Sequence, residues 1–215
     1  EVTLSHNGVL FLDELPEFPR SVLEVLRQPL EDGIVHIARV NATLSYPARF
    51  VLIAAMNPCP CGFLGDTDHP CTCTTGEIRR YARKISGPLL DRIDLHVTVE
   101  RPNYAELITE IPQESSAAIR SRVLKARQIQ EERLRGFGLS CNAHMGHREI
   151  KETCPLTKEA QLLLEQVFNK LKLSARSYDR IIKVSRTIAD LSHSEEIDDT
   201  HVAEAVSYRN TLQRM

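Results

Sequence analysis

The chain has 215 residues, of which 42% are hydrophobic and 26% are charged, an ordinary balance for a soluble globular protein with one large core or two small ones. No apolar run approaches the roughly 20 residues that span a bilayer, so we expect a cytoplasmic protein without a membrane partner. The net charge of −2 excludes a general positive field, so any site for a polyanion must be a local patch. The chain begins at Glu1, without an initiator methionine or a signal sequence, and we therefore expect it to be a piece of a longer protein.

The first half alternates between apolar strands and helices. Residues 8–15 (GVLFLDEL) predict a buried parallel strand that ends in Asp13 and Glu14, and a helix follows from about Ser21 until Gly33 stops it. Residues 34–47 predict a hairpin, and residues 50–56 predict a second buried strand that leads into Asn57.

An irregular loop over residues 58–76, a helix over 77–85, a tight turn near 89–91 and a strand over 94–99 complete this half. The alternation predicts an α/β fold, in which a parallel sheet carries helices on both faces. We assign this part to residues 1–112.

The second half is predicted to be helical. Residues 115–135 form a long charged helix, residues 139–154 a polar linker, and residues 157–170, 175–191 and 199–209 three further helices. Their starts are marked by Thr157, Ser174 and Asp198, which are good N-terminal caps. We assign residues 113–155 to a connecting helix and linker, and residues 156–215 to a helical lid.

The acids that follow the first strand have the chemistry of nucleotide hydrolysis. In that interpretation Asp13 holds Mg²⁺ through water, Glu14 polarises the attacking water, and Asn57 orients that water from the end of the next strand. The alternatives are a strand that ends in exposed acids, and an asparagine that forms a turn before Pro58.

Two arginines are candidates for contacts with phosphate. Arg92 follows a tight apolar turn, from which its guanidinium could project toward the nucleotide of a neighbouring subunit. Its alternative is a surface arginine paired with Asp91 or Asp94. Arg176 begins a basic stripe with Arg180 and Lys183 at a helix N-terminus, which suits phosphate but is also the pattern of a solvated face.

Four cysteines, Cys59, Cys61, Cys71 and Cys73, lie within fifteen residues. Four thiolates brought together by a short loop match a closed tetrahedral Zn²⁺ site in ligand type and number. Free thiols or an oxidised disulfide are the alternatives, and His69 is a possible substitute ligand.

Several segments together resemble the magnesium-chelatase-like AAA+ ATPases, and within them the YifB/ComM competence-associated group. They are GVLFLDELPEF, RQPLEDG, YPARFVLIAAMNPCPCG, SGPLLDRIDLHV and SARSYDRIIKVSRTIADL. The resemblance implies ATP and Mg²⁺ as cofactors and a homo-oligomeric ring, expected to be a hexamer.

Carried over residue by residue, the resemblance makes Asp13 and Glu14 the Walker B acids and Asn57 the sensor-1 residue. Arg92 becomes the arginine finger and Arg176 the sensor-2 arginine. The pattern departs from the family in one respect: no G-x-x-x-x-G-K-[ST] phosphate loop occurs among the 215 residues. In the family this Walker A loop precedes Walker B, so we expect it upstream and expect this piece to be inactive alone.

The sequence is compatible with three functions. The first is a motor that remodels DNA, in a helicase-like or branch-migration role during natural competence, with Arg39 and Asn41 of the hairpin as candidate DNA contacts. The second is a chelatase-type motor that drives metal insertion. The third is a zinc-bearing binding module without ATPase activity.

Overall fold

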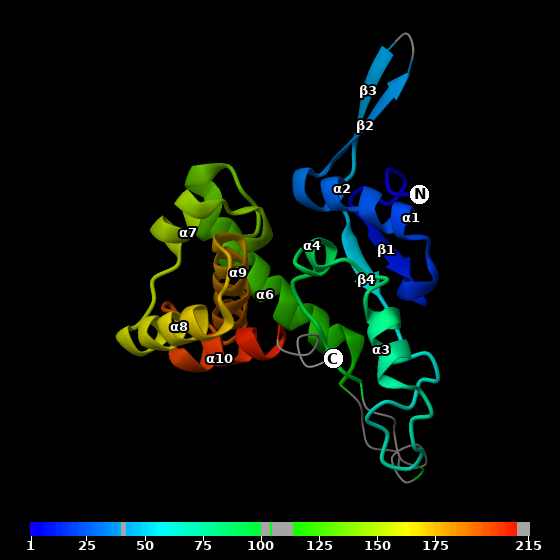
Figure 1. Ribbon diagram of the computed structural model, residues 1–215. Coiled ribbons are helices and arrows are strands. Elements are labelled where there is room, and N and C mark those ends of the chain that lie inside the picture. Colours follow the sequence, from blue (N-terminus) through cyan, green and yellow to red (C-terminus); the bar gives the residue numbers. More distant parts are fainter. Residues whose placement is uncertain (40–41, 100–103, 105–113, 210–215) are drawn as a thin grey trace. The chain divides into compact units, whose positions relative to one another are not determined.

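The computed structural model describes residues 1–39, 42–99, 104 and 114–209 (Figure 1). The chain forms two compact units, residues 1–93 and 94–214, with a mixed α/β fold in the first and helices in the second. Among the described residues, no helix is both long enough and apolar enough to cross a membrane.

The centre of the first unit is a parallel pair of strands. β1 (Val9–Leu12) pairs with β4 (Val51–Ala54), with Leu12 opposite Ala54. Leu10 and Leu12 pack on a core supplied by η1 (Leu15–Glu17), α1 (Arg20–Val25), α4 (Gly87–Leu90) and the residues between them. The buried members of this core are Leu15, Leu23, Leu26, Ile85 and Leu89.

The predicted covering of both sheet faces is wrong for the described part of the chain. Val9, Phe11, Val51 and Ile53 alternate with the core residues and are 49–59% exposed. Parallel strands are normally covered on both faces. Here the described helices of this unit cover one face, because α1 and α4 both pack on the side of Leu10 and Leu12.

The helix predicted to start near Ser21 is present in two pieces, α1 and α2 (Arg27–Asp32), which meet at Leu26. Gly33 ends α2 with a left-handed φ of 66°, as predicted, and an added Cβ there would lie 2.8 Å from Cγ of Arg49.

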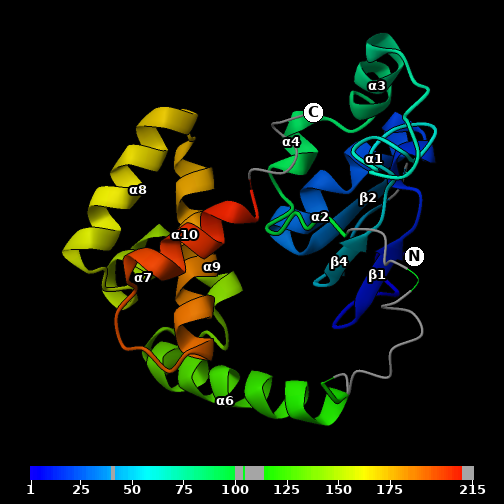
Figure 2. The same ribbon diagram turned by 90° about the horizontal axis from the view of Figure 1, so that it is seen from below.

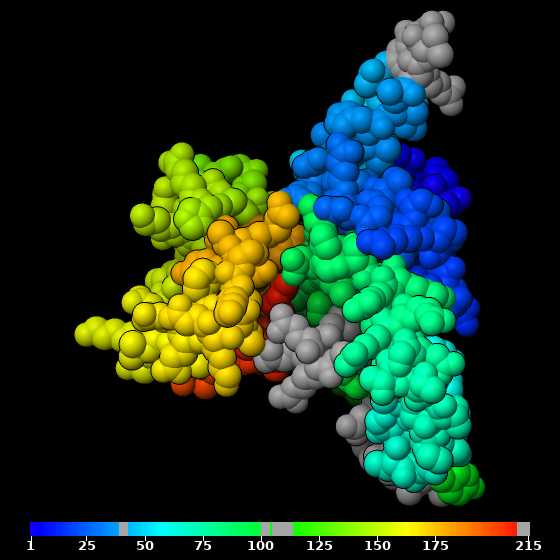
Figure 3. All heavy atoms as spheres, in the orientation of Figure 1, coloured from blue at the N-terminus to red at the C-terminus, as the bar shows by residue number. Residues whose placement is uncertain are grey.

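The predicted hairpin is confirmed. β2 (Ile34–Arg39) and β3 (Ala42–Pro47) pair antiparallel and project from the first unit (Figures 1 and 3). Strand alternation places Val35, Ile37, Leu44 and Tyr46 on one face. Arg39 ends β2, whereas Asn41 lies outside the described residues.

The strand predicted over residues 94–99 is wrong. These residues form no strand, and Leu95, Val97 and Val99 are 50–87% exposed. Alternating apolar residues become a strand only when another strand accepts their backbone hydrogen bonds. In this segment the His96 N–H instead donates to the Tyr208 carbonyl at 2.8 Å.

The second unit is a helical bundle around α9 (Ala175–Leu191), which packs against α6 (Ser116–Leu134), α7 (His147–Thr153) and α10 (Asp199–Ser207) (Figure 2). α8 (Lys158–Leu171) packs against α10. The side chains of Ser115, Thr157, Ser174 and Asp198 accept backbone N–H bonds at the helix starts. The three helices predicted beyond residue 156, together with their caps, are confirmed.

The predicted polar linker over residues 139–154 is instead folded. It contains η3 (Asn142–His144), which follows η2 (Arg135–Phe137), and it also contains α7. Met145, Ile150 and Cys154 are at most 4% exposed and belong to the bundle core. The segment is polar on average, so its composition did not reveal that these three apolar residues pack in the core.

Candidate functional site

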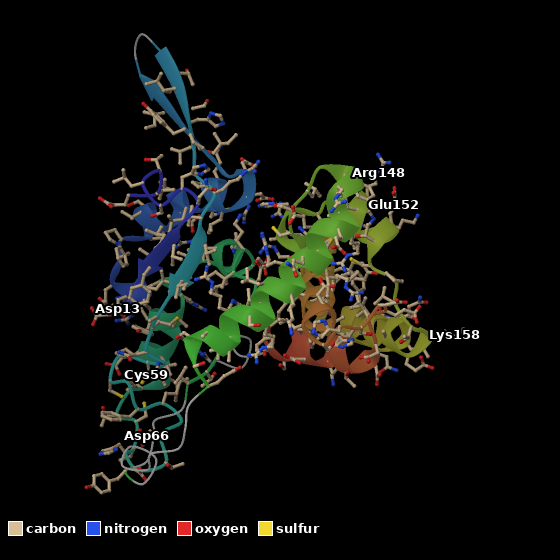
Figure 4. The ribbon with its side chains drawn as sticks, turned by 180° about the vertical axis from the view of Figure 1, so that it is seen from behind. Asp13, Cys59, Asp66, Arg148, Glu152 and Lys158 are labelled. Atoms are coloured by element: carbon tan, nitrogen blue, oxygen red, sulfur yellow. The ribbon has the colours of Figure 1, made fainter. Side chains whose placement is uncertain are left out.

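The ends of β1 and β4 bring the predicted acids and Asn57 to the same edge of the sheet. The register continues past both strands, since the Ala55 N–H donates to the Leu12 carbonyl (2.9 Å) and the Leu15 N–H to the Ala55 carbonyl (3.0 Å). Asp13 and Glu14 lie between these two bonds. Asn57 follows two residues after Ala55, beyond the end of the neighbouring strand. Figure 4 shows Asp13 at this edge.

The backbone at Glu14 is unusual. Glu14 has φ 50° and ψ 46°, the left-handed region that a residue with a side chain rarely adopts. Such conformations cost on the order of 1–3 kcal/mol and gather at functional sites. The Glu14 N–H donates to Oδ1 of Asp13 at 2.9 Å. Asp13, Glu14 and Asn57 are all exposed, so this edge is open to a ligand.

Tyr81, a residue that the sequence did not single out, packs beside this edge. It lies in α3 (Thr75–Ala82) and is 8% exposed. Burial raises the pKa of Tyr81 above its ordinary value, the Glu17 carboxylate adds to this, and a hydrogen bond with the Asn57 backbone opposes it. The apolar spacing of Ile78, Tyr81 and Ile85 is the signal that marks this inward face.

The four clustered cysteines converge. Cys59 Sγ lies 3.4 Å from Cys61 Sγ and 3.7 Å from Cys71 Sγ, and the latter two are 3.6 Å apart. All four sulfurs lie within 4.8 Å of one another. In a tetrahedral site with metal–sulfur bonds of about 2.3 Å, neighbouring sulfurs lie roughly 3.8 Å apart. The cluster therefore has the dimensions of a tetrahedral site.

The thiols are close enough to shift one another's pKa values. A backbone hydrogen bond from Phe63 lowers the pKa of Cys61 to about 5. Burial, together with the nearby Cys61 and Cys59 groups, raises the pKa of Cys73 to about 12. Four thiolates at these distances repel one another unless a cation neutralises them, and the donor set is the one that zinc prefers. His69, the possible substitute, stacks on Phe63 instead, with ring centroids 5.1 Å apart.

The cluster joins the sheet edge to α3. Cys59 comes two residues after Asn57, and Cys73 directly precedes Thr74, which caps α3 in a reciprocal capping box with Glu77. Cys59 is fully buried, and Figure 4 shows it next to the sheet edge that carries Asp13. Asp66, in the farther part of the loop, accepts the backbone N–H groups of Asp68 and His69.

Arg92 does not project from the surface. Its side chain is 10% exposed and forms an ion pair with Glu31. Its Nε donates to the Arg27 carbonyl at 3.1 Å and its Nη1 to the Pro88 carbonyl at 2.7 Å. The guanidinium thus ties α4 to α2, and neither Asp91 nor Asp94 is the acid in that ion pair.

Arg92 and the acids lie at opposite ends of the sheet. The Gly33 carbonyl, at the end of α2, accepts the Ala48 N–H at 2.7 Å, shortly before β4 begins. Arg92 is bound to α2, which lies at the end of the sheet where β4 begins (Figure 1), whereas Asn57 follows the other end of β4.

The predicted basic stripe on α9 is largely engaged within the second unit. Arg180 is 16% exposed and pairs with Asp94 at 2.5 Å. Lys183 donates to the Ala143 carbonyl at 3.2 Å, and burial lowers its pKa. Arg176 lies exposed in the first turn of the helix. The other face of α9 enters the core, with Ile181, Ile182 and Ser185 buried.

Comparison with known proteins identifies both halves of the chain. The family model described as "Magnesium chelatase, subunit ChlI" matches residues 1–107, and the model described as "Magnesium chelatase, subunit ChlI C-terminal" matches residues 113–209.

Three relatives show the range of similarity. "Competence protein ComM" of Haemophilus influenzae is 48% identical over 97% of this chain and 40% of its own length. "Uncharacterized protein YifB" of Escherichia coli is 45% identical over 97% and 40%. "Magnesium-chelatase subunit ChlI" of Chlorella vulgaris is 25% identical over 58% and 34%. The chain thus spans about 40% of the length of the first two.

Proposed function

This chain belongs to the magnesium chelatase family, and from that premise we propose that it is part of an AAA+ ATPase motor that remodels DNA. The observation that carries the proposal is the joining of Asp13, Glu14 and Asn57 at one open sheet edge by the parallel register of β1 and β4. Ligands of parallel sheets bind at this carboxyl edge. Among the described strands, β1 and β4 form the one parallel pair, and the acids and Asn57 follow its ends.

In this proposal the acids divide the work of hydrolysis. Asp13 holds a water-coordinated Mg²⁺, and Glu14 accepts a proton from the attacking water. Asn57 orients that water toward the γ-phosphate. The left-handed backbone of Glu14 supports the assignment, because strained conformations of this kind gather at functional sites.

Two arginines complete the proposed site in the whole protein. Arg92 acts as the arginine finger for the nucleotide of a neighbouring subunit in a ring, expected to be a hexamer, and Arg176 is the sensor-2 contact. The position of Arg92 away from the acids supports a role in trans, because its own nucleotide belongs at the opposite edge.

The cysteine cluster is proposed to bind one structural Zn²⁺. Four protein ligands leave no open coordination position, so the ion would not take part in chemistry. Its role would be to hold Asn57 and α3 in place, since Cys59 and Cys73 flank that connection.

Similarity favours DNA over a porphyrin as the target. The relative named as a competence protein aligns over nearly the whole chain at 48% identity, whereas the chelatase subunit aligns over 58% of it at 25%. The β2–β3 hairpin projects from the first unit, and its first strand ends at Arg39. We propose that this projection contacts a DNA strand.

The test is DNA-stimulated ATP hydrolysis by the whole protein that contains this chain. Glu14→Gln should lower turnover by at least about 100-fold while ATP binding persists, because only the proton acceptor is lost. Glu159→Gln, an equal change at an exposed position in the first turn of α8, should leave turnover unchanged.

The 215-residue chain, which lacks a phosphate loop, should hydrolyse no ATP. Turnover by this chain that Glu14→Gln abolishes would contradict that expectation. Stimulation by a porphyrin and a metal ion in place of DNA would support metal insertion instead.

A further inference from the structure

A basic groove lies in the first unit, between residues 16–20 and the C-terminal end of α3 with the turn that follows it. We define it by Arg20 on one wall and by Arg80, Arg83 and Lys84 on the other, with Phe18 and the neighbouring prolines as its apolar lining. Of the described residues that line it, Glu17 is the single acid. All four cations have exposed side chains.

The cations converge because of how α3 is buried. Tyr81 faces inward, so the positions around it on the helix are divided between a buried and an exposed side. Arg80 lies in the last turn of α3, Arg83 caps its C-terminal end and Lys84 lies in the turn that follows, and all three line the groove. Arg20, from the start of α1, meets this face from a distant part of the sequence.

The acids near the groove are largely engaged elsewhere. Glu77 caps α3 through Thr74, and Glu24 pairs with Arg27 at 2.7 Å. Lys84 does pair with Glu17 at 3.0 Å, but both side chains are 43–59% exposed. An exposed pair of this kind contributes little and exchanges readily for another anion. The groove therefore keeps a local excess of positive charge, although the chain as a whole carries −2.

We propose that this groove binds the phosphate backbone of single-stranded nucleic acid. A row of cations along a groove matches a repeating anion better than one isolated phosphate. Binding there needs no base recognition, so it would not depend on sequence. The inference rests on the proposed function, because it adds a DNA contact to that motor.

The groove walls connect directly to the candidate hydrolysis site. η1, which begins directly after Glu14, leads into one wall, and α3, which follows the cysteine cluster, forms the other. Tyr81 of α3 forms a hydrogen bond with the Asn57 backbone. A nucleic-acid strand bound between the walls would therefore contact both segments that follow the candidate hydrolysis site. Through these contacts, DNA binding could change the position of the hydrolytic residues.

The test is fluorescence anisotropy of a labelled oligothymidylate of about 20 nucleotides titrated with the 215-residue chain. The double variant Arg80→Gln/Arg83→Gln should bind at least about tenfold more weakly at low salt. The slope of log affinity against log salt should become shallower by about 1.4, or about 0.7 for each lost phosphate contact. Equal zinc content and unfolding temperature would show that the fold is intact.

Arg79→Gln is the matched control, since Arg79 is an exposed cation on the same helix that does not line the groove. It should keep its affinity within about twofold. An equal loss of affinity in this control would contradict the proposed groove, because it would show that binding depends on the general positive charge of the helix. Competition by polyglutamate as strong as by DNA, or by millimolar inorganic phosphate, would also overturn it.

The inference and the proposed function can fail separately. Normal DNA binding by the double variant, with DNA-stimulated turnover intact in the whole protein, would remove the groove and leave the motor. Normal binding by the double variant combined with a loss in Arg39→Gln would transfer the contact to the hairpin. A groove that binds DNA in a protein without DNA-stimulated turnover would contradict the motor alone.

Discussion

At the scale of single residues, the second unit depends on a buried ionic network. Asp190, which is fully buried, accepts two hydrogen bonds from Arg133 at 2.6 and 2.7 Å and one from Asn142 at 2.8 Å. Arg186, which is 1% exposed, donates to it at 3.1 Å. The other nitrogens of Arg186 bond the carbonyls of residues 194 and 195, so the network anchors the turn before α10.

Removal of the central acid should be severe. Asp190→Ala would leave two arginines without their carboxylate in a buried site, which typically costs about 3–5 kcal/mol. We expect that loss in the free energy of unfolding, measured by urea denaturation and helical circular dichroism. Arg148→Ala, which removes an exposed pair with Glu152, should leave it almost unchanged. A small effect of Asp190→Ala would show that this site is open to water.

The network also shows a limit of reading residues one at a time. The sequence singled out Arg176, Arg180 and Lys183 as a phosphate stripe, yet passed over Arg186 on the same helix. Arg180 and Lys183 bind groups inside the unit because Asp94 and the Ala143 carbonyl are brought to them by the fold. No local pattern reports partners so distant in sequence.

At the scale of elements, α3 owes its position to contacts at both of its ends. The cysteine cluster precedes it directly, the Thr74–Glu77 box caps it, and Tyr81 anchors it beside Asn57. Because Cys59 is fully buried just after the sheet edge and Cys73 directly precedes α3, loss of the cluster would release both segments.

A ligand substitution tests the metal directly. Cys71→Ser should weaken zinc binding by at least about 100-fold, since even outer partners of a metal site contribute 10–100-fold. The zinc content, measured by elemental analysis, should fall from one ion per chain toward none, and the unfolding temperature should decrease. Cys141→Ser, a buried cysteine outside the cluster, should keep its zinc. Equal zinc in both variants, or none in the unmodified reduced chain, would contradict the site.

Helices of the second unit were more predictable than the strands of the first. The starts of α8, α9 and α10 could be predicted because each is capped by a local side-chain hydrogen bond, which needs only neighbouring residues. The capping residues are Thr157, Ser174 and Asp198. Residues 94–99 have the alternation of a strand but no strand partner in the described chain. A strand is a property of two segments, so one segment alone could not decide it.

At the scale of the whole molecule, Arg92 raises the question of assembly. It lies toward the start of β4, whereas Asp13, Glu14 and Asn57 lie beyond the strand ends. Its guanidinium is held by Glu31 and by the carbonyls of Arg27 and Pro88. A role in trans therefore requires either that a neighbour docks onto this bound arginine or that it leaves Glu31 on assembly.

Mixing two variants of the whole protein separates these roles. Arg92→Ala should retain ATP binding and lose about 100-fold or more in turnover, as should Glu14→Gln. Rings that contain both variants should regain activity, because an intact Glu14 can face an intact Arg92 of the adjacent subunit.

Glu31→Gln is the control for a structural role, since it removes the ion pair and leaves the arginine. If Arg92 acts on a neighbour's nucleotide, Glu31→Gln should keep most turnover. A loss equal to that of Arg92→Ala, with no recovery in mixed rings, would assign Arg92 to the fold alone.

The sequence by itself determined the features that arise from neighbouring residues: the β2–β3 hairpin, the stop at Gly33, the capped helices α8–α10 and the four cysteines in one loop. The motifs also determined the family, because their order and spacing can be read from the sequence without a structure. Only the tertiary structure decided which sheet face is covered, that residues 139–154 fold into the core, and where Arg92 and Arg186 find their partners. Each of these depends on groups tens of residues apart, whose approach is set by packing and not by local pattern.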